Sequence, residues 1–294
     1  MKLVSFLNNG VASYGILEGT QIRDIGHALS AQWPDLKAML GQDYRAVSAE
    51  VRDDAPVLNL ADVELLPPIP NPAKVFCIGH NYEEHRVETG RPKTTFPAVF
   101  LRFADTLVPH GQSGWVPASS VEVDYEGELA VVIGRSGRHI PRVEALEHVA
   151  GYSCFNDISI RDWQRHTSQF TPGKNFPHTG GFGPWIVTAD EIEDPQELEL
   201  TTRLNGETVQ HATTAQMIFP VNEIIEYISS FTQLYPGDVI ASGTPGGVGV
   251  RRTPQLFMKA GDAVEVEIGS IGTLRIAMVA EAVAGDASRH HATR

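Results

Sequence analysis

The stretch 121-VEVDYEGELAVVIG-134 places four carboxylates at alternate positions, directly before an apolar run. The four acids are Glu122, Asp124, Glu126 and Glu128. Alternate side chains of a β-strand share one face, so a strand through this stretch would bring the acids together. Like charges at that separation repel one another and need water or a cation to offset the repulsion. The stretch therefore predicts either a solvated edge strand or a strand that holds a metal ion.

Two strand rises of ~3.3 Å separate Glu126 from Glu128, so their carboxylates can converge on one hard cation. Gly127 between them would allow close packing on the opposite face of the strand. A third acid, Asp157, stands in an apolar frame further along the chain, where a carboxylate must be paired, cap a helix or bind a ligand. Capping of the next helix by Asn156 or Asp157 is the alternative to metal binding.

The segment 79-GHNYEEHRVETGRP-92 carries a candidate acid–base pair. His85 and Glu88 have i, i+3 spacing, so they are neighbours if the segment is helical. A carboxylate beside an imidazole fixes its tautomer and raises its basicity, which suits a general base. An ordinary ion pair on the surface is the alternative interpretation.

Cations gather near these acids in a chain whose formal net charge is −13. Arg86, Arg91 and Lys93 lie beside the histidine pair, and Lys174 is the only lysine or arginine in a loop rich in glycine and proline. Arg161 follows Asp157. Arg86, Arg91, Lys93 and Arg161 suggest a second carboxylate on a substrate, with salt bridges in a lid or a dimer as the alternative.

Two further segments have features of a binding site. The helix predicted after Asp157 places Arg161, Gln164 and Arg165 on one face. The stretch 241-ASGTPGGVG-249 predicts a strand and a glycine-rich turn that presents backbone N–H groups and the Thr244 hydroxyl to an anion, although many such turns are only turns. The sequence lacks the GK[ST] of a P-loop, a G-x-S-x-G elbow and a dinucleotide-binding fingerprint.

Short strands separated by turn residues dominate the chain, which contains 27 glycines and 19 prolines. Strands are predicted at 75–79, 129–134, 185–189, 198–206, 238–243 and 263–269. Helices are predicted at 142–151, closed by Gly151, and at 220–234, with Ile224, Ile225, Ile228 and Phe231 on one face. Because strands outnumber helices and do not alternate with them, we expect a β-rich α+β fold and not a doubly wound α/β fold.

The pattern also predicts domain boundaries. Asn9-Gly10 between two apolar runs indicates a β-hairpin, a short third strand follows Gly19, and 26–52 is partly helical. The prolines of 65-LLPPIPNPAKV-75 exclude a helix and indicate an extended linker. We therefore expect a small N-terminal domain at 1–68, a catalytic domain at 69–284 and a disordered tail at 285–294.

The composition argues against several classes of partner. The chain has a pI of about 5.3 and no run of lysine or arginine, so nucleic acids and anionic membranes are not expected partners. No apolar run reaches the ~18 residues of a membrane span. The apolar start is too short for a signal peptide. Cys77 and Cys154 form no C-x-x-C motif and are expected to be core residues, which fits a cytoplasmic location.

The chain resembles the fumarylacetoacetate hydrolase family, in its acylpyruvate hydrolase-like branch, over about residues 74–283. Six stretches in the family's order carry the resemblance: FCIGHNYEEH, DYEGELAVVIG, GYSCFNDISIRDWQ, GKNF…GPW, NEIIEYIS and PGDVIASGTPGGVG. The resemblance implies a mixed β-roll or β-sandwich core behind a small N-terminal β-containing domain. It also implies a homodimer.

The family's functional residues fall on nine positions of this chain. The implied ligands of Mg²⁺, with Mn²⁺ or Ca²⁺ as alternatives, are Glu126, Glu128 and Asp157. The implied catalytic residues are His85, Glu88 and Lys174. The implied substrate-binding residues are Arg161, Gln164 and Thr244.

The resemblance implies a metal-dependent hydrolase of carbon–carbon bonds in ketonic substrates. It would cleave an acylpyruvate-type 2,4-diketo acid from the catabolism of aromatic or sugar-derived acids, releasing pyruvate and a carboxylic acid. His85, oriented by Glu88, would deprotonate water, and Lys174 or Gln164 would stabilise the oxyanion. The loop 175-NFPHTGGFG-183 departs from the family's pattern and leaves the distal substrate group open.

Two other functions remain as alternatives. One is an isomerase or decarboxylase of a 2-hydroxymuconate-type diacid or an oxaloacetate-like 2-oxo acid at the same metal site, because a shared fold does not fix the reaction. The other is a non-catalytic binding protein on the same scaffold, which the presence of both His85 and Glu88 disfavours.

Overall fold

The computed structural model describes residues 1–282, and β-strands make up most of its regular structure. The predicted tail at 285–294 lies outside the described residues. The strands are β1 (Lys2–Asn8), β2 (Val11–Glu18), β3 (Gln21–Arg23), β4 (Val57–Asn59), β5 (Glu64–Leu65), β6 (Val75–Gly79), β7 (Ala98–Arg102), β8 (Leu107–Val108), β9 (Ser113–Val116), β10 (Val123–Asp124), β11 (Gly127–Ile133), β12 (Val149–Asp157), β13 (Ser159–Ile160), β14 (Gly180–Thr188), β15 (Glu199–Leu204), β16 (Glu207–Thr213), β17 (Val239–Ala241), β18 (Ala263–Ile268) and β19 (Gly272–Ala280). The α-helices are α1 (Gly26–Leu29), α2 (Leu36–Leu40), α3 (Tyr44–Val51), α4 (Glu83–Glu88), α5 (Arg161–Gln164), α6 (Thr171–Lys174) and α7 (Val221–Phe231).

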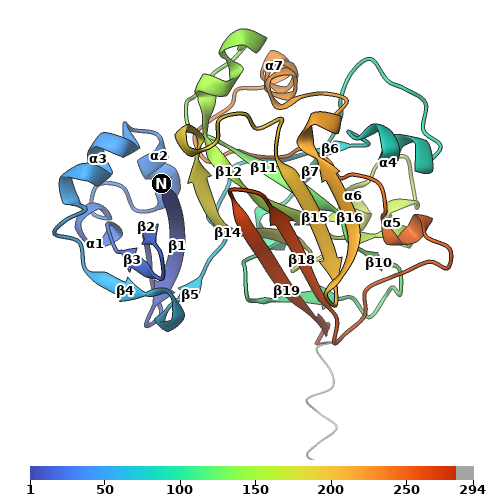
Figure 1. The fold of residues 1–294 in the computed structure, drawn as a ribbon, viewed down its shortest axis with the longest axis horizontal. Helices are drawn as coiled ribbons and strands as arrows, with labels where there is room; N and C mark the ends of the chain where they lie inside the picture. Colours follow the sequence, from blue (N-terminus) through green and yellow to red (C-terminus); the bar gives the residue numbers. More distant parts are fainter. Residues whose placement is uncertain (283–294) are drawn as a thin grey trace, which may run out of the picture.

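One large mixed sheet forms the centre of the molecule (Figure 1). Its strands follow the order β4-β3-β2-β1-β14-β12-β11-β17-β6-β7, with β5 on β1 and β8 on β14. Most neighbours are antiparallel, but β17 runs parallel to β6, and β14 runs parallel to β8. The long central strands β11 and β12 are buried along their whole length, which explains why the sequence shows apolar runs there instead of strict alternation.

A second sheet packs against the first. Its order is β16-β15-β18-β19-β9. Leu129 and Cys154 of the large sheet share one buried cluster with Leu200, Val266 and Ile276 of the second sheet. The predicted β-rich α+β class with a roll or sandwich core is therefore confirmed.

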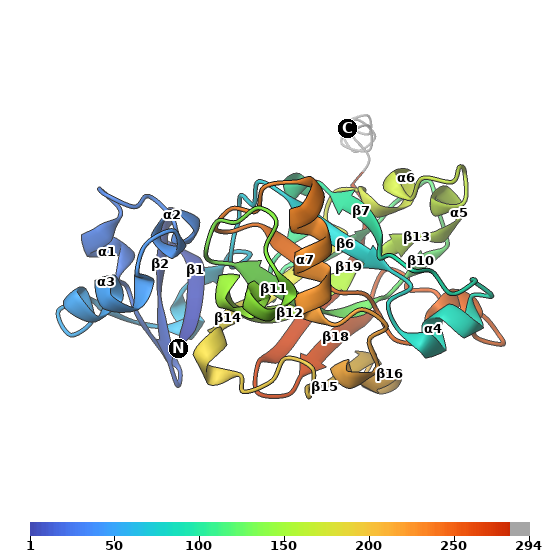
Figure 2. The same ribbon diagram turned by 90° about the horizontal axis from the view of Figure 1, so that it is seen from above.

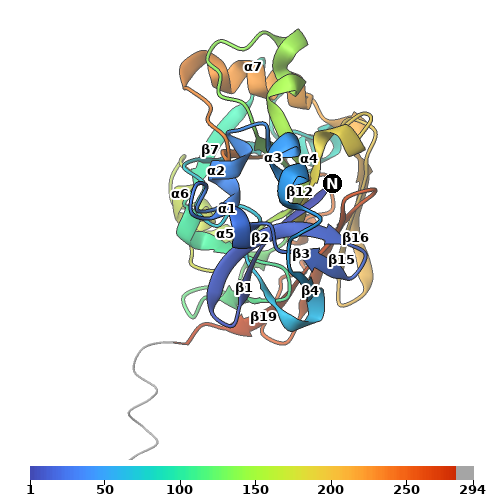
Figure 3. The same ribbon diagram turned by 90° about the vertical axis from the view of Figure 1, so that its left-hand side faces the viewer.

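The N-terminal unit lies at one side of the molecule, where α1, α2 and α3 gather beside β1–β4 (Figure 3). The predicted hairpin is present: β1 and β2 join through Asn9 and Gly10, which have φ angles of 51° and 79°. Lys2 and Leu3 of β1 pair with β14, so the large sheet continues into this unit. The unit's independence as a domain ending at residue 68 stays a prediction.

Helix α7 covers part of the large sheet, as Figure 2 shows. It begins after Pro220, as predicted, and Ile224, Ile225 and Ile228 are buried in the same cluster as Val131 of β11. Phe231, expected on the same face, is 51% exposed because the helix ends there.

The prediction of an α-helix at 142–151 is wrong in both the type of helix and its bounds. Residues 142–148 form a 3₁₀ helix, and β12 begins at Val149. Gly151 does not close a helix: it lies in β12 opposite Thr188 of β14, and its φ is not positive. Residues 149–151 occupy a buried strand position between β11 and β14, which outweighs helical propensity at this end of the segment.

The single strand predicted to carry four acids is also wrong. Asp124 ends β10, which pairs with β13, whereas β11 begins only at Gly127 and pairs with β12. The chain bends between these strands because the Asp124 carboxylate accepts hydrogen bonds from the backbone N–H groups of Tyr125, Gly249 and Val250. Asp124, Glu126 and Glu128 are buried, whereas Glu122 is partly exposed and pairs with Arg165.

Two further predictions concern the cysteines, expected in the core, and membrane spans, of which none was expected. Cys77 and Cys154 are both buried free thiols, as expected for core residues. Within residues 1–282, no helix is long and apolar enough to cross a membrane.

The packing at Gly151 gives a test of the fold. A Cβ atom at this position would fall 2.6 Å from Ile186 Cγ2 and even closer to the Val187 carbonyl oxygen, which belongs to the backbone and cannot move aside cheaply. We expect Gly151→Ala to lower the free energy of unfolding by roughly 1–3 kcal/mol or more, measured by urea denaturation. Gly269→Ala is the matched control, because its Cβ would meet nothing closer than 3.9 Å. Equal stability of the two variants would contradict the packing of β12 on β14.

Candidate active site and metal centre

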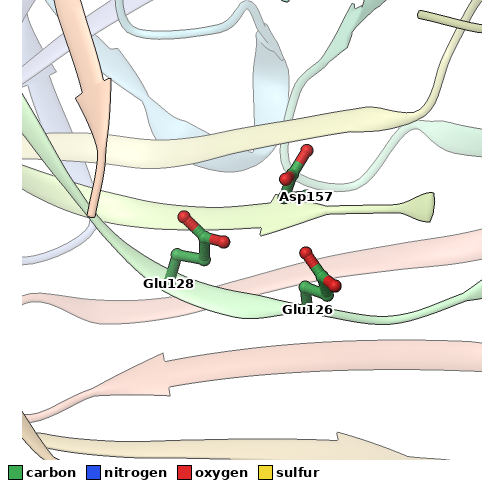
Figure 4. A group of neighbouring side chains, drawn as sticks. All are labelled: Glu126, Glu128 and Asp157. Atoms are coloured by element: carbon green, nitrogen blue, oxygen red, sulfur yellow. The ribbon is translucent and has the colours of Figure 1, made fainter. Parts of the chain in front are cut away.

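Three buried carboxylates converge where β11 and β12 lie side by side. Glu126 immediately precedes β11, Glu128 lies within it, and Asp157 ends β12. Figure 4 shows the three side chains turned toward one another from the two neighbouring ribbons. One ligand oxygen of each lies within 4.8 Å of the others. Since Asp157 belongs to β12 and Ile160 is the N-cap of α5, the helix-capping alternative for Asn156 and Asp157 is excluded.

Two of these acids are paired with buried cations. The Lys174 ammonium lies 2.6 Å from both Glu126 Oε2 and Asp157 Oδ2. The Arg161 guanidinium lies 2.7 Å from Glu126 Oε1, and Arg102 forms an ion pair with Asp157. Burial opposes ionisation of Glu126, but Lys174 and Arg161 outweigh it and hold the pKa of Glu126 below its ordinary value.

Glu128 differs from the other two acids. Within the described residues no cation pairs with it, and its carboxylate accepts one hydrogen bond, from the Gly243 N–H at 2.8 Å. Burial raises the pKa of Glu128 well above its ordinary value, and Asp157 and Glu126 raise it further. A buried carboxylate repelled by two neighbours needs a further cation, and three convergent carboxylates are the donors that hard divalent ions prefer. The residues therefore fit a divalent metal ion.

The backbone between the two glutamates is held in place by side chains from other strands. The Gly127 N–H donates to Gln210 Oε1, and the Thr244 hydroxyl donates to the Gly127 carbonyl. Gln210 also donates to Thr244 Oγ1, so β16 and the turn after β17 support the metal-site strand together. A Cβ at Gly127 would collide with Thr202 Oγ1, which confirms the close packing expected opposite the glutamates.

The predicted pair of His85 and Glu88 is formed on helix α4. His85 Nδ1 lies 2.7 Å from Glu88 Oε1, and Glu88 Oε2 accepts a hydrogen bond from the Gly247 N–H. His85 is buried, which argues against an ordinary surface ion pair. Because Nδ1 is held by a carboxylate, Nε2 is the ring nitrogen of His85 that Glu88 leaves free.

A second histidine, His80, packs on this pair. Its ring stacks on His85 with centroids 5.3 Å apart, and it meets Phe170 edge-on. Its φ is 55°, an uncommon conformation for a residue other than glycine. Burial, and then His85, lower the pKa of His80 to about 4. His80 is therefore neutral at pH 7 and does not repel a protonated His85.

A cavity of about 580 Å³ joins these groups. Of the predicted site residues, those that line it are His85, Glu126, Glu128, Arg161, Gln164, Lys174 and Thr244. Asp157 and Glu88 lie behind this lining and hold Lys174 and His85. The structure thus brings all nine predicted residues to one place, whereas their individual roles stay predictions.

The short helix α5 supplies the polar wall beside the acids. Arg161 donates to Asp124 Oδ2 through Nε at 2.8 Å and to Gln164 Oε1 through Nη1 at 2.9 Å. Its pKa is raised because Glu126 and Asp124 outweigh the effect of burial. Arg161 is therefore held as a fixed cation by the protein itself.

Sequence reasoning missed three residues of the site: His80, Arg102 and Gln210. Arg102 carried a signal, because a charged residue in the apolar run of β7 must find a buried partner. His80 was part of a quoted motif but has no metal-ligand spacing, and Gln210 lies in an alternating strand of the second sheet, where nothing local marks it. Only the tertiary contacts reveal these two.

Comparisons with known proteins agree with this geometry. The family profile described as "Fumarylacetoacetate (FAA) hydrolase C-terminal" matches residues 74–279. A human protein named as a mitochondrial oxaloacetate tautomerase is 42% identical over 240 residues, 81% of this chain and 75% of its own length. The oxaloacetate tautomerase YisK of Bacillus subtilis is 43% identical over 223 residues, 74% of this chain and 73% of its own.

A solved structure extends the likeness to the whole fold. The maleylpyruvate hydrolase of Sphingobium sp. SYK-6, in complex with manganese(II) and pyruvate, superimposes with a TM-score of 0.80 at 28% identity. The alignment covers 96% of this chain and all of the hydrolase. A divalent metal site therefore occurs in a neighbour of the same fold.

Because Glu128 and Asp157 lie in different environments, we expect substitutions at these two positions to have different effects on the stability of the metal-free protein. In chelator, we expect Asp157→Asn to lower stability by about 3–5 kcal/mol, because it leaves Arg102 without its buried partner. Glu128→Gln should leave stability unchanged or raise it, because it removes a repelled charge. In thermal unfolding with Mn²⁺, both variants should lose most of the metal-induced rise in Tm.

Glu122→Gln is the matched control, since Glu122 belongs to the same acidic run but pairs with Arg165 at the surface. Because the folded pKa of Glu128 is raised, the metal-free protein should lose stability as pH rises from 4.5 toward that raised value. Glu128→Gln should remove this loss. A Glu128→Gln protein as unstable in chelator as Asp157→Asn would contradict the assignment.

Proposed function

The chain belongs to the fumarylacetoacetate hydrolase family, and we propose that it is an isomerase that interconverts the keto and enol forms of an oxaloacetate-type 2-oxo acid. This is one form of the alternative kept from the sequence, and it is favoured here over hydrolysis of an acylpyruvate. The relatives in human and Bacillus subtilis that share more than 40% of their aligned residues with this chain are both named oxaloacetate tautomerases.

The single observation that carries the proposal is the buried pair of His85 and Glu88 beside the acid triad. Tautomerisation needs one group that moves a proton between C3 and the 2-oxo oxygen of the substrate. His85 Nε2 suits this task, because Glu88 holds Nδ1 and stabilises the protonated imidazole. His85 lines the same cavity as Glu126 and Glu128 of the acid triad.

The position of Lys174 supports tautomerisation over hydrolysis. Hydrolysis of a diketo acid requires a donor at the distal carbonyl, and Lys174 or Gln164 was the expected donor. Its ammonium is instead held between Glu126 and Asp157, and the side chain is 2% exposed. Burial opposes the charge of Lys174, but Asp157 and Glu126 outweigh it and raise the pKa, so Lys174 stays protonated. Its role here is to fix the two carboxylates.

We propose Mg²⁺, with Mn²⁺ as a substitute, as the ion held by Glu126, Glu128 and Asp157. When bound, the ion would supply a Lewis acid that polarises the 2-oxo group and stabilises negative charge on its oxygen. The protein's own side chains would position the substrate. Arg161 and Gln164 would orient the substrate from α5, while His80 stacks on His85 and is itself packed against Phe170.

Hydrolysis of an acylpyruvate remains the second candidate. It is favoured by the likeness to the maleylpyruvate hydrolase of Sphingobium, whose structure contains pyruvate. This reaction would require His85 to activate a water molecule, and Gln164 would have to replace Lys174 as the oxyanion donor. Decarboxylation of a 2-oxo diacid uses the same enolate but releases carbon dioxide.

Two further properties stay proposals. We propose a homodimer, as the resemblance to the family implies. We also retain the expected cytoplasmic location, which rests on the two reduced cysteines, although the human relative is named as mitochondrial.

One experiment distinguishes tautomerisation from hydrolysis and from decarboxylation. We expect the enzyme with Mg²⁺ to speed the loss of enol absorbance of freshly dissolved enol-oxaloacetate, with no release of pyruvate or carbon dioxide above the buffer rate. An acylpyruvate of matched length should not be cleaved. Release of pyruvate from the acylpyruvate, without acceleration of oxaloacetate tautomerisation, would support the hydrolase and refute the proposal.

The dyad can be tested by substitution on α4. We expect His85→Asn to lower kcat by about 10²–10⁴-fold, the usual contribution of a general acid–base group. Glu88→Gln should lower kcat less and shift the pH profile, because the amide cannot stabilise protonated His85. Glu83→Gln removes an exposed carboxylate on the same helix and should leave kcat unchanged. Full activity of His85→Asn would eliminate His85 as the proton carrier.

A further inference from the structure

We propose that Arg91 and Arg251 form a subsite for the second carboxylate of a 2-oxo dicarboxylic acid. The inference rests on the proposed function, and it names the residues that select a diacid. Both arginines line the same cavity as His85 and the acids Glu126 and Glu128.

Most cations of the cavity wall already have carboxylate partners in the protein. Arg161 pairs with Asp124 and Glu126. Lys174 pairs with Glu126, and Arg165 pairs with Glu122 at 2.6 Å. A substrate carboxylate would have to compete with these ion pairs, so these residues are poor candidates for a distal anion site.

Arg91 and Arg251 are different. Within residues 1–282, neither guanidinium forms an ion pair with a carboxylate, although the chain carries a formal net charge of −13. The side chain of Arg251 donates only to the Thr89 carbonyl, at 3.2 Å. Thr89 precedes Arg91 by two residues, so the two arginines meet the same end of α4. Two uncompensated guanidiniums at one wall form an anion site.

The sequence suggested four cations as partners of a second substrate carboxylate, and the structure leaves one of them. Arg86 is engaged by Glu83 through two hydrogen bonds, and it does not line the cavity. Lys93 does not line the cavity either, and Arg161 is neutralised by the buried acids. Arg91 remains, and Arg251, which had no sequence signal, joins it.

Other polar residues of the cavity lining could add hydrogen bonds to a bound carboxylate. Thr167, Ser168 and Gln255 line the same cavity and offer hydroxyl and amide donors. A guanidinium presents a planar pair of N–H groups that matches the two oxygens of a carboxylate. The cavity thus has a carboxylate-rich end that suits a metal-chelating 2-oxo acid and an arginine wall that suits a second negative charge.

The consequence is selectivity by charge. A 2-oxo monoacid and a 2-oxo diacid of equal chain length present the same chelating group, but only the diacid can contact Arg91 and Arg251. Charge-assisted hydrogen bonds of this kind correspond to about tenfold to hundredfold in affinity. We therefore expect the protein to bind the diacid about tenfold to hundredfold more tightly than the monoacid.

Binding measured by calorimetry with Mg²⁺ tests the subsite. The probes are two matched pairs: 2-oxoglutarate with 2-oxopentanoate, and 2-oxoadipate with 2-oxohexanoate. In the unmodified protein, at least one diacid should bind at least ~10-fold more tightly than its monoacid. In the double variant Arg91→Gln/Arg251→Gln that ratio should fall to about one, with the Kd of the monoacid unchanged.

Arg135→Gln is the matched control, because it removes one positive charge from an exposed arginine outside the cavity lining. It should keep the diacid preference. A preference that survives in the double variant, a preference that is equally lost in Arg135→Gln, or no preference in the unmodified protein would each overturn the subsite.

The binding readout separates this inference from the proposed function. If diacids bind preferentially through the two arginines but oxaloacetate is not tautomerised, the subsite stands and the reaction assignment fails. If oxaloacetate is tautomerised while the double variant keeps its preference for diacids, the reaction stands and the subsite fails.

Discussion

The structure depends on a cluster of buried charges with an unequal number of partners. Asp124, Glu126 and Asp157 are each paired with Arg161, Lys174 or Arg102, whereas Glu128 has no cation within the described residues. Removal of charges from water is costly, and close pairing recovers that cost only when each charge has its partner. Glu128 is therefore a buried carboxyl group whose ionised form is not stabilised by an ion pair within the described residues. The proposed divalent ion would complete the cluster.

The same cluster ties the fold to the site. Arg102 comes from β7, Asp157 from β12, Lys174 from α6 and Arg161 from α5, so elements distant in sequence meet at the acids of β11. Gln210 adds the second sheet by bonding to Gly127. The residues that hold the carboxylates also connect the two sheets, and this explains why the site lies inside the core and not in a surface loop.

Much of this arrangement was predictable from the sequence. Strands β6 and β11 coincide with apolar runs, and β15 and β18 coincide with alternating segments. Helix α7 begins after a proline and has an apolar face, so local patterns were sufficient for these elements. The acid pair around Gly127 and the spacing of His85 and Glu88 are likewise local signals. The end of the segment at 142–151 was not predictable, because residues 149–151 lie between β11 and β14, where strand pairing overrides the helical composition. The bend at Asp124 depends on N–H groups more than a hundred residues away, at Gly249 and Val250.

The position of Lys174 changed the interpretation of the chemistry. As an isolated cation in a loop it suited an oxyanion donor, but in the structure it neutralises two of the acids. A site with a buried base, fixed carboxylates and no free ammonium suits proton transfer at a 2-oxo acid better than attack by water. We therefore favour the isomerase alternative over the hydrolase, in agreement with the names of the relatives.

The most direct test of the account is a crystal structure of the protein with Mn²⁺ and oxalate, read by anomalous scattering. The account predicts one Mn²⁺ peak in contact with Glu126, Glu128 and Asp157. Oxalate should lie between the ion and His85 Nε2, with Lys174 still paired to the carboxylates. A peak elsewhere, or a peak that leaves Glu128 without contact, would contradict the account.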